Sequence, residues 1–427
     1  MYGIGLILGA GIYVLIGDVA GIAGNALWAS FAIAAVIATF TGLSYAELIS
    51  MFPRAAAEFA FVKNAFENKL AAFVVGWMIT FVAVASAAAV ASGFAGYLGV
   101  FIPGVDKMLL AIGLVIALSV INFIGIRESA WLNTAFTLIE LAGLALIVVA
   151  ATTAGSFTDI DYYELPQGPV TSMPVVVGTV LAGATLAFFA FFGFENLANI
   201  AEETKNAIKT IPKALILSIV ITTGIYMLIA LSAIALVGWE SLSLSDAPLA
   251  LAAEKAFGAT GVIVLSTVAL FATSNTVLMM LVAGSRIMFG MAREEALPSK
   301  ISDVHALTGT PWVSVVIVMF ATIAIIVLSG GVIADVANVA VFIIFLVYAV
   351  VNIALIWLRY RKPALSRPFR SPIAIRWFPV LAGIGLVTSL AMLTQFDEKS
   401  VVAGIITVAL GVAAYLVVAG IKGRRLV

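Results

Sequence analysis

The chain has 427 residues, of which 63% are hydrophobic and only 10% charged, too few charges to cover the surface of a soluble domain. It has no net charge, no cysteine and one histidine, which argues against a nucleic-acid partner, disulfides and a thiolate or histidine metal centre, so we expect neither metal nor cofactor. The composition is that of an integral membrane protein.

Twelve apolar stretches have about the 20 residues that a helix needs to cross a bilayer. We therefore predict an all-α membrane protein with a single domain. The predicted spans are 1–20, 24–50, 70–99, 108–125, 129–154, 173–200, 211–238, 258–291, 312–329, 331–358, 373–394 and 400–421. The first span begins at residue 1 without the basic flank of a signal peptide, so we expect a cytoplasmic tail to precede it.

Basic residues divide unevenly between the loops on the two sides. With the N-terminus inside, only Lys107, Lys255 and Lys399 fall in outer loops, which leaves 19 of the 22 lysines and arginines inside. Cytoplasmic loops collect positive charge, so we predict a cell-membrane protein with both termini in the cytoplasm. We interpret the basic stretch 359–377 as an ordinary inner loop, with binding of anionic lipid headgroups as the alternative.

Two of the spans are interrupted. The first contains "GLILGAGIYV" (5–14), with three glycines that each weaken a helix by roughly 1 kcal/mol. The sixth contains "LAFFAFFGFENLANIAEETKN" (186–206), in which Gly193 and Glu195 break an aromatic run. These two spans cross in opposite senses, and paired interruptions of this kind indicate an inverted-repeat transporter with its substrate site near the midplane.

Several stretches also resemble a known family. In chain order they are "GAGIYVL", "YAELISMFPRAAAEFAFVKNAF", "FFAFFGFENLANIAEETKNAIKTIPKA", "GSRIMFGMAREEALPSKISDVHALTGTPW" and "RPFRSPIAIRWFPVLAGI". The chain is thereby identified as resembling the amino acid–polyamine–organocation (APC) transporter superfamily, close to its cationic amino acid transporter and bacterial permease branch. It departs from the family at Ala56 and Ala57, where glycine is usual.

The resemblance implies a LeuT-type fold. Residues 1–154 and 173–358 would form two inverted repeats of five helices with discontinuous helices 1 and 6, and 373–421 would add two further helices. It also implies alternating-access transport of α-amino acids as a secondary permease.

The resemblance places a substrate site at the two breaks. The amides at Gly9, Ala10, Gly11 and Ile12 would hold the substrate carboxylate at a helix N-terminus. The carbonyls of Ile7 and Phe189 would take the amino group. The alternative for the glycines is close helix packing through small residues.

Aromatic residues of the sixth span complete this prediction. Phe189 matches the family's gating aromatic, and Ala190 and Phe192 are assigned to the substrate pocket beside it. Phe188 and Phe191 are expected to be packing residues, an interpretation that also stays open for Phe192. Glu195 is predicted to take part in ion or proton coupling, with a structural hydrogen bond to the unwound backbone as the alternative.

Two acidic features bear on energy coupling and closure. Glu140 lies twelve residues beyond Glu128, about 18 Å along a helix, and so near the middle of a hydrocarbon core about 30 Å thick. Intramembrane carboxylates are functional by default, and proton-coupled relatives resemble this segment with a lysine there. We predict proton symport through Glu140, with sodium binding, amino acid exchange or a purely structural Glu140 as rivals. Glu202 and Glu203 are interpreted as interfacial, or as a latch to inner-loop cations.

Other function classes are less consistent with the residues. An intramembrane hydrolase needs a nucleophile with a base or a metal cluster, and the chain offers no such set. A channel or passive receptor stays open as a different class. Oligomeric state and the identity of the amino acid are not encoded in any recognisable pattern.

Overall fold

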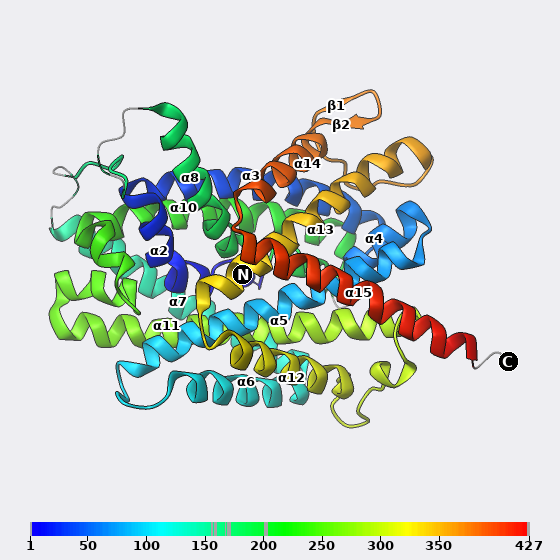
Figure 1. Cartoon of the computed structure of the whole chain (residues 1–427), viewed down its shortest axis with the longest axis horizontal. Coiled ribbons are helices and arrows are strands. Elements are labelled where there is room, and N and C mark those ends of the chain that lie inside the picture. Colours follow the sequence, from blue (N-terminus) through cyan, green and yellow to red (C-terminus); the bar gives the residue numbers. More distant parts are fainter. Residues whose placement is uncertain are drawn as a thin grey trace.

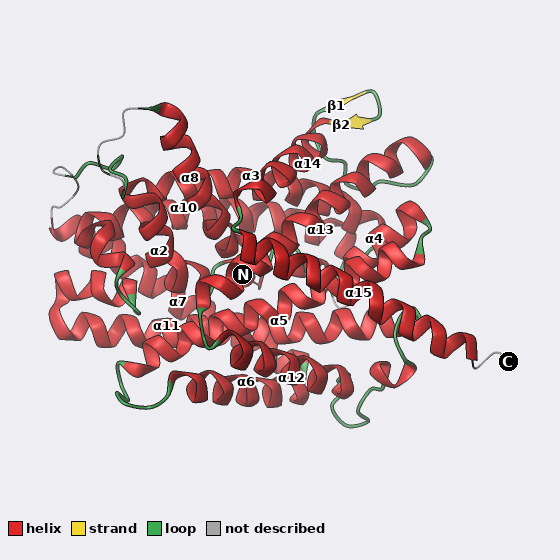
Figure 2. Cartoon of the chain, in the orientation of Figure 1, coloured by secondary structure: helices red, strands yellow, loops and turns green. Residues whose placement is uncertain are grey.

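The structure, a computed structural model, describes residues 2–154, 157, 160–166, 168, 172–199 and 204–424. Figure 2 shows that helices make up almost all of it, with one short hairpin of strands. The described residues include ten helical segments that are long and apolar enough to cross a membrane. One of them, Gly3–Met51, covers most of the first predicted span and all of the second, and a shorter apolar helix at Val380–Gln395 overlaps the eleventh. The predicted all-α membrane fold is confirmed.

The elements follow the predicted order of spans. They are α1 (Tyr2–Ile7), α2 (Ala10–Ala23), α3 (Leu27–Met51), α4 (Ala57–Phe66), α5 (Lys69–Gly99), α6 (Lys107–Ile124), α7 (Ile126–Ala154), α8 (Met173–Ala187), η2 (Phe188–Phe191), α9 (Asn196–Asn199), α10 (Ala207–Ser243), α11 (Pro248–Arg293), α12 (Trp312–Ser329), α13 (Ile333–Arg361), β1 (Ala374–Ile375), β2 (Phe378–Pro379), α14 (Val380–Met392) and α15 (Glu398–Arg424). Single 3₁₀ turns, η1 (Gly24–Ala26), η4 (Ser299–Ser302) and η5 (Leu393–Gln395), complete the list.

Several predicted span boundaries were wrong. The eleventh span begins at Val380 rather than 373, because the antiparallel β1–β2 hairpin takes up the preceding residues. Helices α10 and α11 run past their predicted limits through Gly238 (φ 71°) and Gly258 (φ 59°). At both glycines the helix turns sharply and then continues, which hydropathy alone does not reveal.

The long helices lie roughly along one axis of the molecule (Figure 1). Helix α3 packs extensively against α10, and α5 against α11. One end of this bundle, called here the basic end, carries Arg54, Lys63, Arg359, Lys362 and the β1–β2 hairpin, which Figure 1 shows at the right.

A buried ion pair joins three segments at the basic end. Glu47 of α3 is fully buried and accepts hydrogen bonds from Arg359 Nε (3.0 Å) and Nη2 (2.5 Å) of α13. The backbone N–H of Ser371, in the loop after α13, donates to the same carboxylate at 2.8 Å. Arg367 adds a second guanidinium, with its Nε 3.5 Å from Glu47. A carboxylate with this many partners holds α3, α13 and the loop together.

Removing one partner of this pair is expected to be costly. Arg359→Met leaves the Glu47 charge buried with weaker compensation, so we expect a loss of about 3 kcal/mol in the free energy of unfolding. The control is Arg361→Met, which removes an exposed cation from the same helix. Thermal unfolding in detergent measures both, and equal shifts for the two variants would contradict the prediction.

Candidate functional site

The first span is broken between α1 and α2, as predicted. Leu8 and Gly9 are not helical, and α2 starts again at Ala10, whose N–H donates to Thr276 Oγ1 of α11 at 2.9 Å. Among the described residues, the N–H groups of Gly11 and Ile12 have no recorded acceptor. Free N–H groups at the first turn of a helix, reinforced by its dipole, form a site for an anion.

The sixth span is also broken, at a point that lies against the break in the first span. Helix α8 passes into the 3₁₀ turn η2, and the chain then turns through Gly193 before α9. Gly193 has a φ of 119°, which favours glycine, and a β-carbon there would overlap the carbonyl of Leu6. A β-carbon on Gly11 would overlap the Cα of Ala190 in η2. The two breaks are therefore in backbone contact with each other.

Tyr226 of α10 connects these breaks and was not recognised in the sequence. Its Oη lies 2.5 Å from the carbonyl oxygen of Ile7 and 2.8 Å from that of Ala190. The hydroxyl has one proton for the two carbonyls, and each carbonyl has two lone pairs, so both keep capacity to accept a second donor. A lone tyrosine in an apolar span needs a partner for its hydroxyl, and that requirement is the signal that would have identified it.

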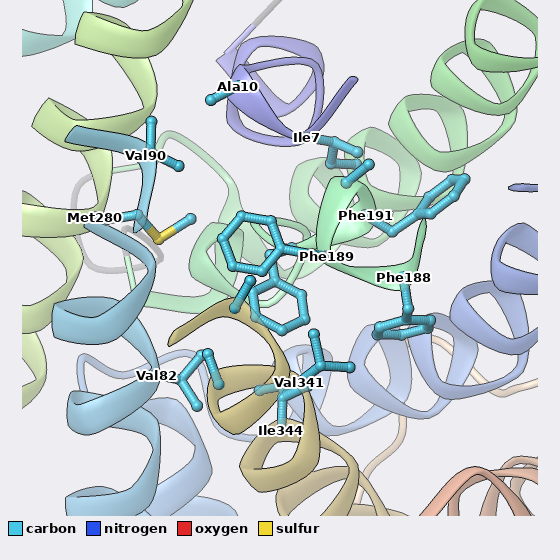
Figure 3. Close-up of a cluster of buried hydrophobic side chains, with 14 of the residues drawn as sticks. Ile7, Ala10, Val82, Val90, Phe188, Phe189, Phe191, Met280, Val341 and Ile344 are labelled. Carbon is cyan, nitrogen blue, oxygen red and sulfur yellow. The ribbon is translucent and has the colours of Figure 1, made fainter. Parts of the chain in front are cut away.

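The aromatic rings of η2 point in different directions, and the gating role of Phe189 stays a prediction. The ring of Phe189 points away from Phe188 and Phe191 and toward Met280 (Figure 3). It stacks at 4.9 Å on Phe192 and is almost completely buried. The ring of Phe188 packs 4.6 Å from that of Phe345, and the ring of Phe191 packs 5.2 Å from that of Tyr226. Ala190 thus lies against Gly11 at the first break, and Ile12, Phe189 and Phe192 are buried.

Glu195 makes the structural hydrogen bond to the unwound backbone that the sequence analysis gave as the alternative to a coupling role. Its carboxylate accepts the N–H of Gly193, with 3.1 Å to the nearer oxygen, and the O–H of Tyr348 from α13 at 3.1 Å. These bonds hold the turn of the sixth span against α13. A role in coupling stays a prediction.

A second buried acid beside this cluster was missed. Glu58 of α4 is fully buried, and its carboxyl faces Tyr45 of α3 and Glu195. The ring of Tyr45 also contacts Tyr348, with 5.7 Å between centroids. Burial raises the pKa of Glu58 to about 8, because the interior disfavours the ionised form. Two acids and two tyrosines therefore form a buried cluster beside the break of the sixth span.

Glu140 of α7 lies in the interior of the protein, and its depth in the bilayer stays a prediction. Its side chain is fully buried, and neither carboxylate oxygen has a hydrogen-bond partner among the described residues. Tyr13 of α2 donates its O–H to the Glu140 backbone carbonyl at 3.2 Å, which places this stretch of α7 against the half-helix that follows the first break. The side chain itself is left available for a proton or a cation.

Polar residues continue from Glu140 along the same helix. Thr137 and Asn133 lie one and two turns before it, and both are buried. Asn133 donates to Asn275 Oδ1 of α11 at 3.1 Å, and Asn275 donates to the Gly5 carbonyl of α1 at 3.4 Å. Buried polar groups therefore connect α1, α7 and α11 through hydrogen bonds.

Exposed ion pairs bridge other segments at the basic end. Glu294, which follows α11, pairs with Lys63 of α4 (2.6 Å) and Arg54 (3.1 Å). Lys362 after α13 pairs with Glu67 after α4 at 2.5 Å. The predicted latch at Glu202 and Glu203 lies outside the described residues.

Comparison with known proteins gives a consistent identity. A family model described as amino acid permease matches residues 1–419. The chain is 28% identical to the branched-chain amino acid permease BcaP of Bacillus subtilis, over 97% of this chain and 90% of that protein. It is 29% identical to the vacuolar cationic amino acid transporter 4 of Arabidopsis thaliana, over 72% of this chain and 54% of that protein.

One further relative is named for a different substrate. The chain is 26% identical to the methylthioribose transporter of Bacillus subtilis, over 97% of this chain and 90% of that protein. All three names describe transporters and none describes an enzyme. The chain belongs to the amino acid permease family of the APC superfamily, and it is a multi-pass amino acid transporter rather than an enzyme.

Proposed function

We propose that this protein is a secondary active permease that moves α-amino acids across the cell membrane by alternating access. The observation that carries the proposal is the contact between the two broken spans. The free N–H groups of Gly11 and Ile12 lie at a helix N-terminus, beside the carbonyls of Ile7 and Ala190 that Tyr226 contacts. An α-amino acid presents a carboxylate and an ammonium close together, which suits amides and carbonyls at this spacing.

The helix packing supports the inverted-repeat organisation of this proposal. Residues 1–154 and 173–358 would be the two repeats, with 373–421 added after them. Under that scheme α3 and α10 are the second helices of their repeats, α5 and α11 are the third, and both pairs pack extensively. The breaks in the first and sixth spans are likewise equivalent and in contact. The distribution of basic residues favours cytoplasmic termini.

Energy coupling is assigned to Glu140. An unpaired carboxyl in the core is tolerated when it is neutral or when it binds a cation. Protonation from one side and release to the other would couple a proton to the substrate. Binding of sodium by the carboxylate is the rival, and amino acid exchange without an ion is the third arrangement.

The direct test is transport by the purified protein in liposomes. Individual amino acids are supplied outside, with and without the same amino acid inside. A carrier saturates and shows counterflow, whereas a channel shows neither, so unsaturable flux without counterflow would overturn the proposal. Methylthioribose is included as a substrate, and its uptake in place of every amino acid would overturn the amino acid assignment.

Phe189 provides a narrower test of the mechanism. If its ring closes the path from the outside, Phe189→Ala should slow the transport of all substrates by about tenfold, since the occluded state loses its cover. The control is Phe320→Ala, because Phe320 of α12 is mostly exposed on the side of the bundle. Initial rates of uptake compare the two, and wild-type rates in Phe189→Ala would return the ring to a packing role.

A further inference from the structure

The basic end contains a cavity with a strong excess of positive charge. The cavity has a volume of about 370 Å³ and lies between the end of α13 and the β1–β2 hairpin. Four guanidinium groups line it, those of Arg359, Arg367, Arg370 and Arg376. A half-open cavity of this size can take a phosphate group with its substituents.

The charges around this cavity are not balanced. In the described part of the chain, the ion pairs recorded for its lining residues all go to Glu47. Four positive charges and one negative charge leave a formal excess of three. Burial lowers the pKa of Arg367, the Glu47 carboxylate opposes this shift, and the neighbouring guanidiniums of Arg359 and Arg370 add to it. The arginines thus repel one another, and an anion in the cavity would relieve that repulsion.

The hairpin beside the cavity exposes apolar side chains. Trp377 is 50% exposed, Ile373 64% and Ile375 69%. Figure 1 shows the hairpin projecting from the side of the bundle at the basic end. Ile373 and Arg376 both have a left-handed backbone, with φ of 59° and 56°, which is unfavourable for side chains other than glycine. The fold tolerates this strain and still presents these groups at the surface.

We propose that this cavity binds the headgroup phosphate of an anionic phospholipid, with the acyl chains lying along Ile373, Ile375 and Trp377. Arginine forks hold phosphate oxygens, and tryptophan is favoured at the membrane–water interface. A free inorganic anion would satisfy the arginines alone and leave the apolar hairpin without a partner. The inference concerns the lipid environment and does not depend on which substrate is transported.

The test is lipid binding by the purified full chain. Phosphatidylglycerol and phosphatidylcholine are added to the protein in detergent, and bound lipid is measured by native mass spectrometry and by the shift in melting temperature. The wild type should retain phosphatidylglycerol at least tenfold more tightly than phosphatidylcholine. Arg370→Gln with Arg376→Gln should abolish that preference, since each basic residue near a surface contributes to attraction of anionic lipid.

Two controls separate a site from general charge. Lys209→Gln with Lys213→Gln removes the same charge from exposed positions of α10 and should leave the preference intact. Trp377→Ala should weaken phosphatidylglycerol binding several-fold while leaving all four arginines. An equal loss in the lysine variant would overturn the proposal, as would inorganic phosphate that gives the same melting shift as phosphatidylglycerol.

Discussion

Glu140→Gln is expected to abolish accumulation of substrate against its gradient while leaving exchange of substrate across the membrane. Glutamine keeps the shape of the side chain and neither gains nor loses a proton, so the variant would resemble a permanently neutral carboxyl. The backbone groups of the two breaks would be unchanged and would still bind substrate. Accumulation should fall from several-fold to none in liposomes with an imposed pH gradient, with counterflow within about twofold of wild type.

The controls for this experiment distinguish the coupling ions. Glu240→Gln removes an exposed carboxylate from α10 and should accumulate substrate normally. If wild-type protein ignores a pH gradient and responds to a sodium gradient, sodium is the coupling ion. If Glu140→Gln accumulates substrate as well as wild type under either gradient, Glu140 has no role in coupling.

Gly11→Ala is expected to eliminate substrate binding. The added β-carbon would overlap backbone atoms of Ala190, and backbone cannot move aside as a flexible side chain can. The two broken spans would have to separate, which displaces the N–H groups of Gly11 and Ile12 from the facing carbonyls. Misplacing positioned groups by about 1 Å costs about 100-fold in function, so transport should fall by at least that factor.

A matched substitution tests whether the effect is local. Gly113→Ala makes the same change in α6 at a glycine with open space around it, so it should be neutral or slightly stabilising. Both variants are compared by binding of the amino acid identified in the transport screen and by melting temperature. Undiminished binding by Gly11→Ala would remove this break from the site.

The positions of the two helix breaks could be predicted from the sequence because their signal is local. Glycines in the middle of apolar spans are costly, and the structure shows that Gly11 and Gly193 stand where another backbone lies against them. The depth predicted for Glu140 in the bilayer rests in the same way on its distance along a helix. Neither conclusion needed knowledge of which helices are neighbours.

Contacts between residues that lie far apart in the chain could not be predicted from the sequence. Tyr226 lies 219 residues from the Ile7 carbonyl that it contacts, and nothing near Tyr226 in the chain marks that contact. Glu58 is a further example, because Tyr45 and Glu195, which act on its buried carboxyl, belong to other segments of the chain. The family resemblance likewise did not predict the ion pairs of Glu294 with Arg54 and with Lys63 of α4.

The ion pairs at the basic end differ in their contact with water. The side chains of Arg54 and Glu294 are 66% and 34% exposed, whereas those of Arg359 and Glu47 are 6% and 0% exposed. Dissolved salt screens exposed charges over about 8 Å at physiological ionic strength and has much less effect on buried ones. Raising the ionic strength should therefore loosen the contact between α4 and the end of α11 while α3 and α13 stay joined.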